Sequence, residues 1–156
     1  PHQPLGSLKP TGASIPLVGL GTWKSVEPGA ARDAVEAALR AGYTHVDCAS
    51  VYENEQEVGD GMAEVFLNTK LNRRDVFITS KLWNDAHAPA DVEHACRASL
   101  ARLRTSYLDL YLMHFPVAFV PGCVEATSAE QMDDTPIEDT WRAMEALVDE
   151  GLVRSQ

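Results

Sequence analysis

The sequence predicts an α/β fold in which helices cover a parallel sheet. Short segments that are mainly apolar, such as VFITSKLW at residues 76–83, alternate with longer segments whose apolar residues recur at helical spacing. Strands without polar alternation are typical of a parallel sheet, because helices bury both of its faces. A chain of 156 residues has the length of one ordinary domain. We therefore expect residues 1–156 to form a single domain.

The first residues favour a small hairpin that leads into the first strand. Two short apolar runs flank Thr11-Gly12, and glycine permits the positive φ that tight turns require. A strand is expected near residues 17–21. Pro28 suits a first helical turn and Gly42 a helix end, which predicts a helix over residues 28–41.

The same alternation then repeats along the chain. We expect strands within residues 44–49, 76–83 and 107–115, and helices over residues 54–68, 89–104 and 136–150. The apolar face of the last helix carries Ile137, Trp141, Met144, Leu147 and Val148. About four strand–helix units result.

A long connection separates the last predicted strand from the last helix. Residues 115–135 show no periodicity and contain several small or acidic residues. Loops of this length inside a compact domain are usually functional, so we expect a flap over a site. The alternative is a plain surface insertion.

Composition excludes several classes of protein. The formal net charge is −10, which opposes binding to nucleic acid or to an anionic membrane. No apolar run approaches the roughly 20 residues of a membrane span. Cys48, Cys96 and Cys123 are odd in number and irregularly spaced, which favours reduced thiols and no metal site. We expect a cytoplasmic protein.

Polar side chains gather where the predicted strands end. Asp47 and Tyr52 follow one strand, Lys81 ends the next, and His114 ends the last. Ligands of parallel α/β proteins bind at this edge of the sheet. Each residue alone has an ordinary structural explanation, such as a cap, a packing aromatic, a solvated lysine or a core histidine. A lysine and an aspartate at a buried rim are costly unless paired, which favours a joint role.

This set suits proton donation to a carbonyl group. A tyrosine is a weak acid, with an ordinary pKa near 10, and an adjacent ammonium favours its phenolate form. Lys81 could supply that charge to Tyr52, with Asp47 holding the lysine in place. His114 could donate a hydrogen bond to the substrate oxygen. Apolar walls that exclude water would strengthen these effects, and the candidates are Trp23, Trp83 and Phe115.

Five segments resemble the aldo-keto reductases, in the aldose and aldehyde reductase branch. They are IPLVGLGTWKS, HVDCASVYENEQEVG, VFITSKLWN, DLYLMHFP and TWRAMEALVDEGLVRS. The similarity extends from about Leu8 to Ser155. It implies a (β/α)8 barrel of the TIM type that uses NADPH to reduce aldehydes and ketones to alcohols, with a small carbonyl compound as substrate.

The resemblance also implies roles for single residues. The catalytic tetrad falls on Asp47, Tyr52, Lys81 and His114, with Tyr52 as general acid. The cofactor-binding positions near the nicotinamide are Gly21, Thr22, Trp23, Asp47 and Lys81. The substrate pocket would be lined by Trp23, Val51, Trp83, Phe115 and Phe119. Phe115 departs from the tryptophan common at this position, which bears on substrate preference.

Four further titratable residues receive ordinary explanations. Glu53 and Glu57 are expected in a first helical turn, where carboxylates interact favourably with the helix dipole. His87 and His94 are expected at the surface, and no metal-ligand spacing links them.

The expected units make up half of the implied barrel. A full (β/α)8 barrel takes about 250 residues, so the resemblance implies an N-terminal half only. In the family, the residues that grip the carboxamide and the adenosine phosphate lie beyond this half. One hypothesis is a truncated or fragmentary enzyme whose family role is NADPH-dependent carbonyl reduction. The other is a non-enzymatic half-barrel that binds or assembles through its open strand edges, for example as a dimer.

Overall fold

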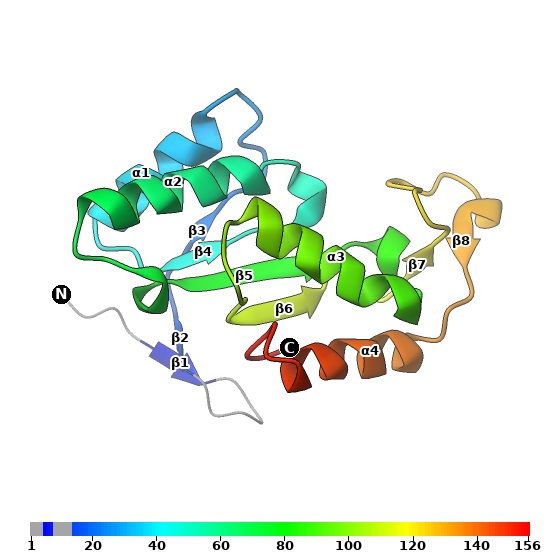
Figure 1. The fold of residues 1–156 in the computed structure, drawn as a ribbon. Coiled ribbons are helices and arrows are strands. Elements are labelled where there is room, and N and C mark those ends of the chain that lie inside the picture. Colours follow the sequence, from blue (N-terminus) through cyan, green and yellow to red (C-terminus); the bar gives the residue numbers. More distant parts are fainter. Residues whose placement is uncertain (1–4, 8–13) are drawn as a thin grey trace.

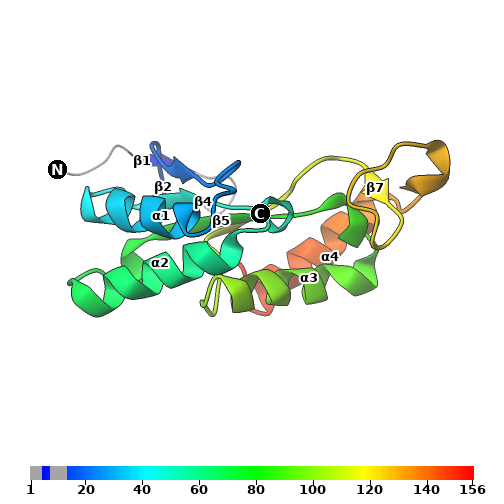
Figure 2. The same cartoon turned by 90° about the horizontal axis from the view of Figure 1, so that it is seen from above.

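The computed structural model describes residues 5–7 and 14–156, and a parallel sheet lies at its centre. The strand order is β3-β4-β5-β6, which follows the chain. The strands are β3 (Leu20–Gly21), β4 (His45–Asp47), β5 (Phe77–Leu82) and β6 (Leu110–Met113). The helices are α1 (Ala30–Arg40), α2 (Glu55–Asn68), α3 (Pro89–Arg102) and α4 (Ile137–Asp149). The helices lie on one side of the sheet (Figures 1 and 2).

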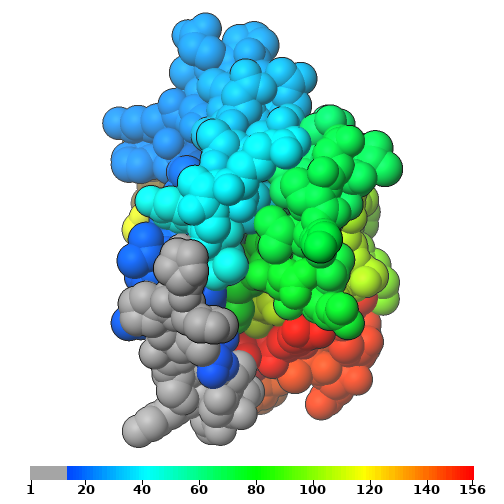
Figure 3. All heavy atoms as spheres, turned by 90° about the vertical axis from the view of Figure 1, so that its left-hand side faces the viewer, coloured from blue at the N-terminus to red at the C-terminus, as the bar shows by residue number. Residues whose placement is uncertain are grey.

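The strand–helix units follow one another around an arc. Figure 3 shows the molecule from the left-hand side of Figure 1, and the colours run from light blue at the top through cyan and green to red at the bottom. After α4, the chain returns to the edge of β6, where Leu108 and Val153 form a parallel bridge. The result is a partial barrel of four units, as the sequence predicts.

The core fills the space between the sheet and the helices. The strands contribute Val46, Ile78 and Leu82, all fully buried. Apolar positions at helical spacing meet them from the helices, and these include Val35, Leu39, Val58, Met62, Val92, Cys96, Met144 and Leu147. Successive side chains of a strand point to opposite faces, so every second residue of β4 and β5 faces the concave side of the sheet instead. Asp47 and Lys81 lie on that concave side.

Two glycines allow α2 to pack closely on both of its neighbours. A Cβ at Gly59 would stand 2.4 Å from the carbonyl oxygen of Arg102, at the end of α3. A Cβ at Gly61 would stand 2.7 Å from the carbonyl oxygen of Arg32 in α1. The absence of side chains at these positions therefore brings the three helices together.

The predicted N-terminal hairpin has its two strands. β1 (Leu5–Ser7) pairs antiparallel with β2 (Ser14–Pro16). The predicted turn at Thr11-Gly12 lies outside the described residues.

The long connection contains structure that the sequence analysis missed. β7 (Ala118–Phe119) pairs antiparallel with β8 (Met132–Asp133), and a 3₁₀ turn at Ala129–Gln131 precedes β8. This small hairpin lies at the end of the sheet toward which β5 and β6 run (Figure 1).

Some expectations about exposure are wrong. His87 is 2% exposed, because the start of α4 covers it and Thr140 donates a hydrogen bond to its carbonyl oxygen. His94 is exposed, as expected. On α4, Ile137 and Trp141 are about two-fifths exposed, while Met144 is buried. The apolar face of α4 is therefore only partly covered in its first turns.

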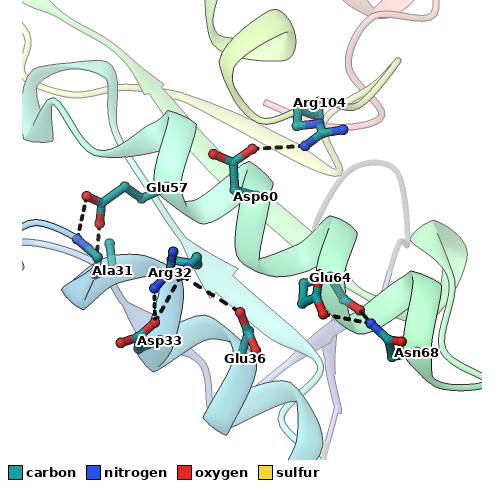
Figure 4. A network of polar contacts seen from close by, with 10 residues as sticks. Ala31, Arg32, Asp33, Glu36, Glu57, Asp60, Glu64, Asn68 and Arg104 are labelled. Carbon is teal, nitrogen blue, oxygen red and sulfur yellow. Dashed lines mark hydrogen bonds and ion pairs between the residues drawn. The ribbon is translucent and has the colours of Figure 1, made fainter.

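Of the two glutamates, Glu57 lies in a first helical turn as expected and Glu53 does not. Glu57 lies in the first turn of α2, but its carboxylate accepts hydrogen bonds from the backbone N–H groups of Gly29 and Ala31, at 2.8 and 3.2 Å. It therefore caps the start of α1 (Figure 4). Glu53 precedes α2 with φ of 56° and is exposed.

No helix in the described residues is long and apolar enough to cross a membrane.

Candidate active site

Lys81 is the centre of the polar cluster on the concave side of the sheet. Its Nζ donates to Oδ1 of Asp47 at 2.6 Å, to the carbonyl oxygen of Cys48 at 2.7 Å and to the hydroxyl oxygen of Tyr52 at 3.3 Å. The Lys81 side chain is 12% exposed. A charge so far removed from water needs partners, and these three contacts supply them.

Tyr52 is held by the backbone that links β4 to α2. It ends a 3₁₀ turn, Ser50–Tyr52, in which its N–H donates to the carbonyl oxygen of Ala49 at 3.1 Å. The side chain of Asn54 is buried and donates to the carbonyl oxygen of Thr22 at 2.8 Å. The loop that carries Tyr52 is thus tied to the end of β3.

His114 lies beside Tyr52, at the end of β6. Its N–H donates to the carbonyl oxygen of Leu82 at 3.0 Å, and its ring centroid is 5.8 Å from that of Tyr52. Nδ1 is buried without a hydrogen-bond partner among the described residues. Burial, and secondly the charge of Lys81, lower the pKa of His114, against the opposing effect of Asp47. The ring is therefore neutral near pH 7, and one of its nitrogens can donate a hydrogen bond.

Aromatic rings surround one side of the cluster. Trp83 contacts His114 edge-on at 5.0 Å, and Phe115 stacks on His114 at the same distance. Phe119, in β7, lies 6.3 Å from Trp83. The indole N–H of Trp83 donates to the carbonyl oxygen of Val124 at 2.9 Å. The long connection therefore lies against Trp83, while its role as a flap stays a prediction.

Of the two remaining predicted pocket residues, Trp23 lies apart from these rings and Val51 shares a groove with Trp83. Trp23 is 66% exposed, and Lys24 lies over its ring at 4.5 Å. The described residues include no ring contact between Trp23 and the other aromatic side chains of the set. Val51 and Trp83 line a groove of about 520 Å³ that also includes Arg102 and none of the four polar residues of the cluster.

The end of β3 has open space on the side of the predicted cofactor position. A Cβ at Gly21 would meet no atom within 4 Å, so space is open beside Asp47, its partner in β4. Thr22 is buried, and both its N–H and its hydroxyl donate to the carbonyl oxygen of Asp47 at 3.1 Å. Gly21 and Thr22 thus both lie against Asp47 at the ends of the strands. The described residues contain no group of three or more His, Cys, Asp or Glu placed to hold a metal ion.

Sequence analysis missed a buried carboxylate next to this cluster. The side chain of Glu55 is fully buried and contacts Ser80 and Arg102. A glutamate at the start of a predicted helix looks like an ordinary exposed residue, so the only signal was its closeness in sequence to Tyr52.

Comparison with known proteins decides the family. Residues 17–156 match the Aldo/keto reductase family. The chain belongs to the aldo-keto reductase family. This aldo-keto reductase chain is 54% identical to aldo-keto reductase family 1 member A1-A of Danio rerio over 152 residues, which are 93% of the chain and 46% of that relative. It is 49% identical to the human family 1 member A1, over 93% of the chain and 46% of the relative.

Solved structures agree with this assignment. The aldose reductase from Schistosoma japonicum superposes with a TM-score of 0.87 at 47% identity, covering 94% of this chain and 50% of that one. The Bombyx mori aldo-keto reductase in complex with NADP gives 0.87 at 38% identity, covering 97% and 48%. This aldo-keto reductase chain spans about half the length of the curated relatives it matches. The predicted family and barrel class are confirmed.

Proposed function

We propose that this chain carries the proton-donating site of an enzyme that reduces aldehydes and ketones to alcohols with NADPH. The observation that carries the proposal is the position of Lys81 Nζ, within 3.3 Å of the Tyr52 hydroxyl and 2.6 Å of Asp47. An ammonium beside a phenol stabilises the phenolate that remains after proton donation. Tyr52 is thus the general acid of this site.

The other residues of the cluster position the groups that react. Asp47 holds Lys81 in place through their ion pair. The neutral ring of His114 donates a hydrogen bond to the substrate oxygen and holds it near the Tyr52 hydroxyl, whose proton passes to that oxygen. When bound, NADPH supplies the hydride. Gly21, Thr22 and Trp23 lie at the strand end where its nicotinamide would bind, next to Asp47 and Lys81.

The substrate is a small carbonyl compound held by apolar walls. Trp83, Phe115 and Phe119 form a connected set of rings next to His114. Trp23 and Val51 complete the proposed pocket. Water excluded by these rings would otherwise weaken the electrostatic effect of Lys81.

The relatives support this proposal at the level of the family. The Bombyx mori structure is a complex with NADP, and the Danio rerio and human relatives are named aldo-keto reductases. Cys48, Cys96 and Cys123 are free thiols in the structure, in keeping with the cytoplasmic location that forms part of the proposal. We also propose that residues 1–156 form one domain.

The test supplies the length of barrel that this chain does not span. The chain is combined with a polypeptide covering the remaining length of the Danio rerio relative, and complex formation is checked by sedimentation. NADPH consumption is then followed with a panel of aliphatic and aromatic aldehydes. We expect turnover, and a loss of about 10²-fold or more in Tyr52→Phe. A complex that binds NADPH but reduces no carbonyl compound, or a Tyr52→Phe variant with full turnover, would contradict the proposal.

A second candidate function is a binding or assembly module that works without catalysis. The observation that favours it is the exposure of Ile137 and Trp141 on α4 beside Met113, around a hollow of about 500 Å³. Large exposed apolar surfaces mark sites of association. A second copy of the chain could cover this surface and bring the open strand edges of two half-barrels together. A compact monomer in sedimentation at micromolar concentration would exclude the dimer.

A further inference from the structure

The fully buried carboxylate of Glu55 lies behind the proposed active site, on the helix side of the sheet. Glu55 is the first residue of α2, and its side chain is 0% exposed. A carboxylate in such a place is costly unless it is paired and hydrogen-bonded. Its partners therefore show what the residue holds together.

The partners come from two other elements. The hydroxyl of Ser80, in β5, donates to Oε1 at 2.6 Å. Arg102, at the end of α3, donates through Nε to Oε2 at 2.9 Å, and its Nη2 lies 2.8 Å from the same oxygen. Gly59 permits this contact, because a Cβ there would collide with the backbone of Arg102. The two carboxylate oxygens thus serve different purposes, one bound to the sheet and one to a helix.

The two residues of the Glu55–Ser80 hydrogen bond are close in sequence to Tyr52 and Lys81. Glu55 follows Tyr52 by three residues, and Ser80 directly precedes Lys81. Because side chains alternate along a strand, Ser80 points to the helices while Lys81 points to the concave side. One hydrogen bond on the back of β5 therefore joins the loop of the proposed acid to the strand of the lysine.

We propose that Glu55 is a positioning residue that sets the separation of the Tyr52 hydroxyl and Lys81 Nζ through its hydrogen bond to Ser80. Arg102 pairs with the Glu55 carboxylate and so compensates its charge in the interior. The effect of this separation on catalysis rests on the proposed function. The positioning of Tyr52 relative to Lys81 by Glu55 does not.

A second buried carboxylate, which lies just before β6 and contacts β5, provides a matched control. Asp109 is 7% exposed, accepts a hydrogen bond from the N–H of Ile78 at 2.9 Å, and pairs with Arg73 at 2.6 Å. Ile78 lies near the start of β5, away from Lys81. A purely stabilising role would make the two carboxylates equivalent in their effect on Tyr52.

The experiment measures amide hydrogen exchange by NMR in the 156-residue chain. Rates at Tyr52 and Glu53, whose N–H groups donate within the 3₁₀ turn, are compared with the rate at Ile78. Each rate is normalised to that of Val46 in β4, which removes any change in global stability. The variants are Ser80→Ala, which removes one hydrogen bond, and Asp109→Asn.

We expect Ser80→Ala to speed exchange at Tyr52 and Glu53 by about threefold to tenfold, as for the loss of one hydrogen bond, and to leave Ile78 unchanged. Asp109→Asn should speed exchange at Ile78 and leave the rates at Tyr52 and Glu53 unchanged. Should Ser80→Ala fail to fold, Glu55→Asp shortens the side chain, keeps its charge and carries the same expectation. Unchanged rates at Tyr52, or equal acceleration by both variants, would overturn the proposal.

A kinetic arm separates this proposal from the proposed function. In the complex with the Danio rerio polypeptide, Ser80→Ala should lower kcat and leave KM close to its original value, because ground-state binding is untouched. A fall in kcat equal to that caused by Asp109→Asn would also overturn positioning. A wild-type complex without any turnover would contradict the proposed function, while the exchange rates would still decide the role of Glu55.

Discussion

At the scale of single residues, the site contains charged side chains whose burial would destabilise the fold if they had no partners. Lys81 depends on Asp47 and on a backbone carbonyl, and Glu55 depends on Ser80 and Arg102. Each pairing joins segments that are 25 or more residues apart in sequence. The chain must therefore fold correctly over long distances before any of these charges becomes tolerable.

Buried histidines predict how stability depends on pH. Burial lowers the pKa of His87, and the carboxylates of Asp85 and Asp133 oppose this without cancelling it. The folded-state pKa thus lies below the unfolded value near 6.5, so the stabilising contribution is complete above that pH and is lost as pH falls below it. His45 and His114 shift in the same direction, mainly through burial.

We expect the free energy of unfolding to fall between pH 7.5 and pH 5, with at most about 1.4 kcal/mol per pH unit for each proton taken up. Urea unfolding at a series of pH values measures this slope. His87→Gln should make it shallower, and His94→Gln, at an exposed position, should not change it. Identical slopes in the two variants would show that His87 is not a source of the effect.

The sequence predicted the four polar residues of the cluster better than it predicted their surroundings. Asp47, Lys81 and His114 were found because the ends of parallel strands meet at one edge of a sheet. Their catalytic roles stay a prediction. His87 was placed at the surface wrongly, because the helix that buries it begins 50 residues later in the sequence. Local patterns carry no information on such a contact.

At the scale of elements, the packing of α2 depends on residues that have no side chain. Gly59 and Gly61 bring α2 against the end of α3 and against α1. The same approach lets Arg102 reach Glu55. Helix spacing and charge pairing are therefore coupled at this point of the fold.

Gly59→Ala should destabilise the chain by about 1–3 kcal/mol, because its Cβ would overlap the carbonyl group of Arg102 and force the helices apart. Gly21→Ala is the control, since a Cβ there meets nothing within 4 Å. Its effect on stability should stay within about 0.5 kcal/mol. Urea unfolding of both variants measures the difference. Equal losses of stability would mean that the close approach of the helices is not the reason for glycine at position 59.

Helices and central strands were predicted within a few residues, since their apolar periodicity is strong. The hairpin of β7 and β8 was missed because strands of two residues are too short to show alternation. The apolar face predicted for α4 is buried at Met144 and about two-fifths exposed at Trp141. Periodicity identifies the apolar side of a helix, but whether that side is covered depends on the elements around it.

At the scale of the whole molecule, the partial barrel combines a strongly acidic surface with a local apolar area. The net charge of −10 opposes close approach of two copies, whereas Ile137 and Trp141 favour it. If α4 carries the association surface, a single charge placed on it should shift the equilibrium between dimer and monomer.

For the assembly hypothesis we expect wild-type chain at micromolar concentration to sediment as a dimer, and Trp141→Glu to sediment as a monomer. The added carboxylate would have to lose water on association. Val26→Glu, at a position that is 79% exposed before α1, is the control and should keep the dimer. Equal sedimentation of all three proteins would remove α4 as the surface of association.

The three-way contact of Glu55, Ser80 and Arg102 also constrains how the sequence can diverge. Loss of Arg102 alone would leave a buried charge uncompensated, while joint replacement of a buried ion pair by well-packed apolar residues is often neutral or stabilising. Stability alone would thus permit an apolar set at these positions, but the routes to it pass through unstable single variants. An apolar set could therefore arise only through coupled substitutions. The resulting fold would be stable, but the loop of Tyr52 would no longer be hydrogen-bonded to the strand of Lys81.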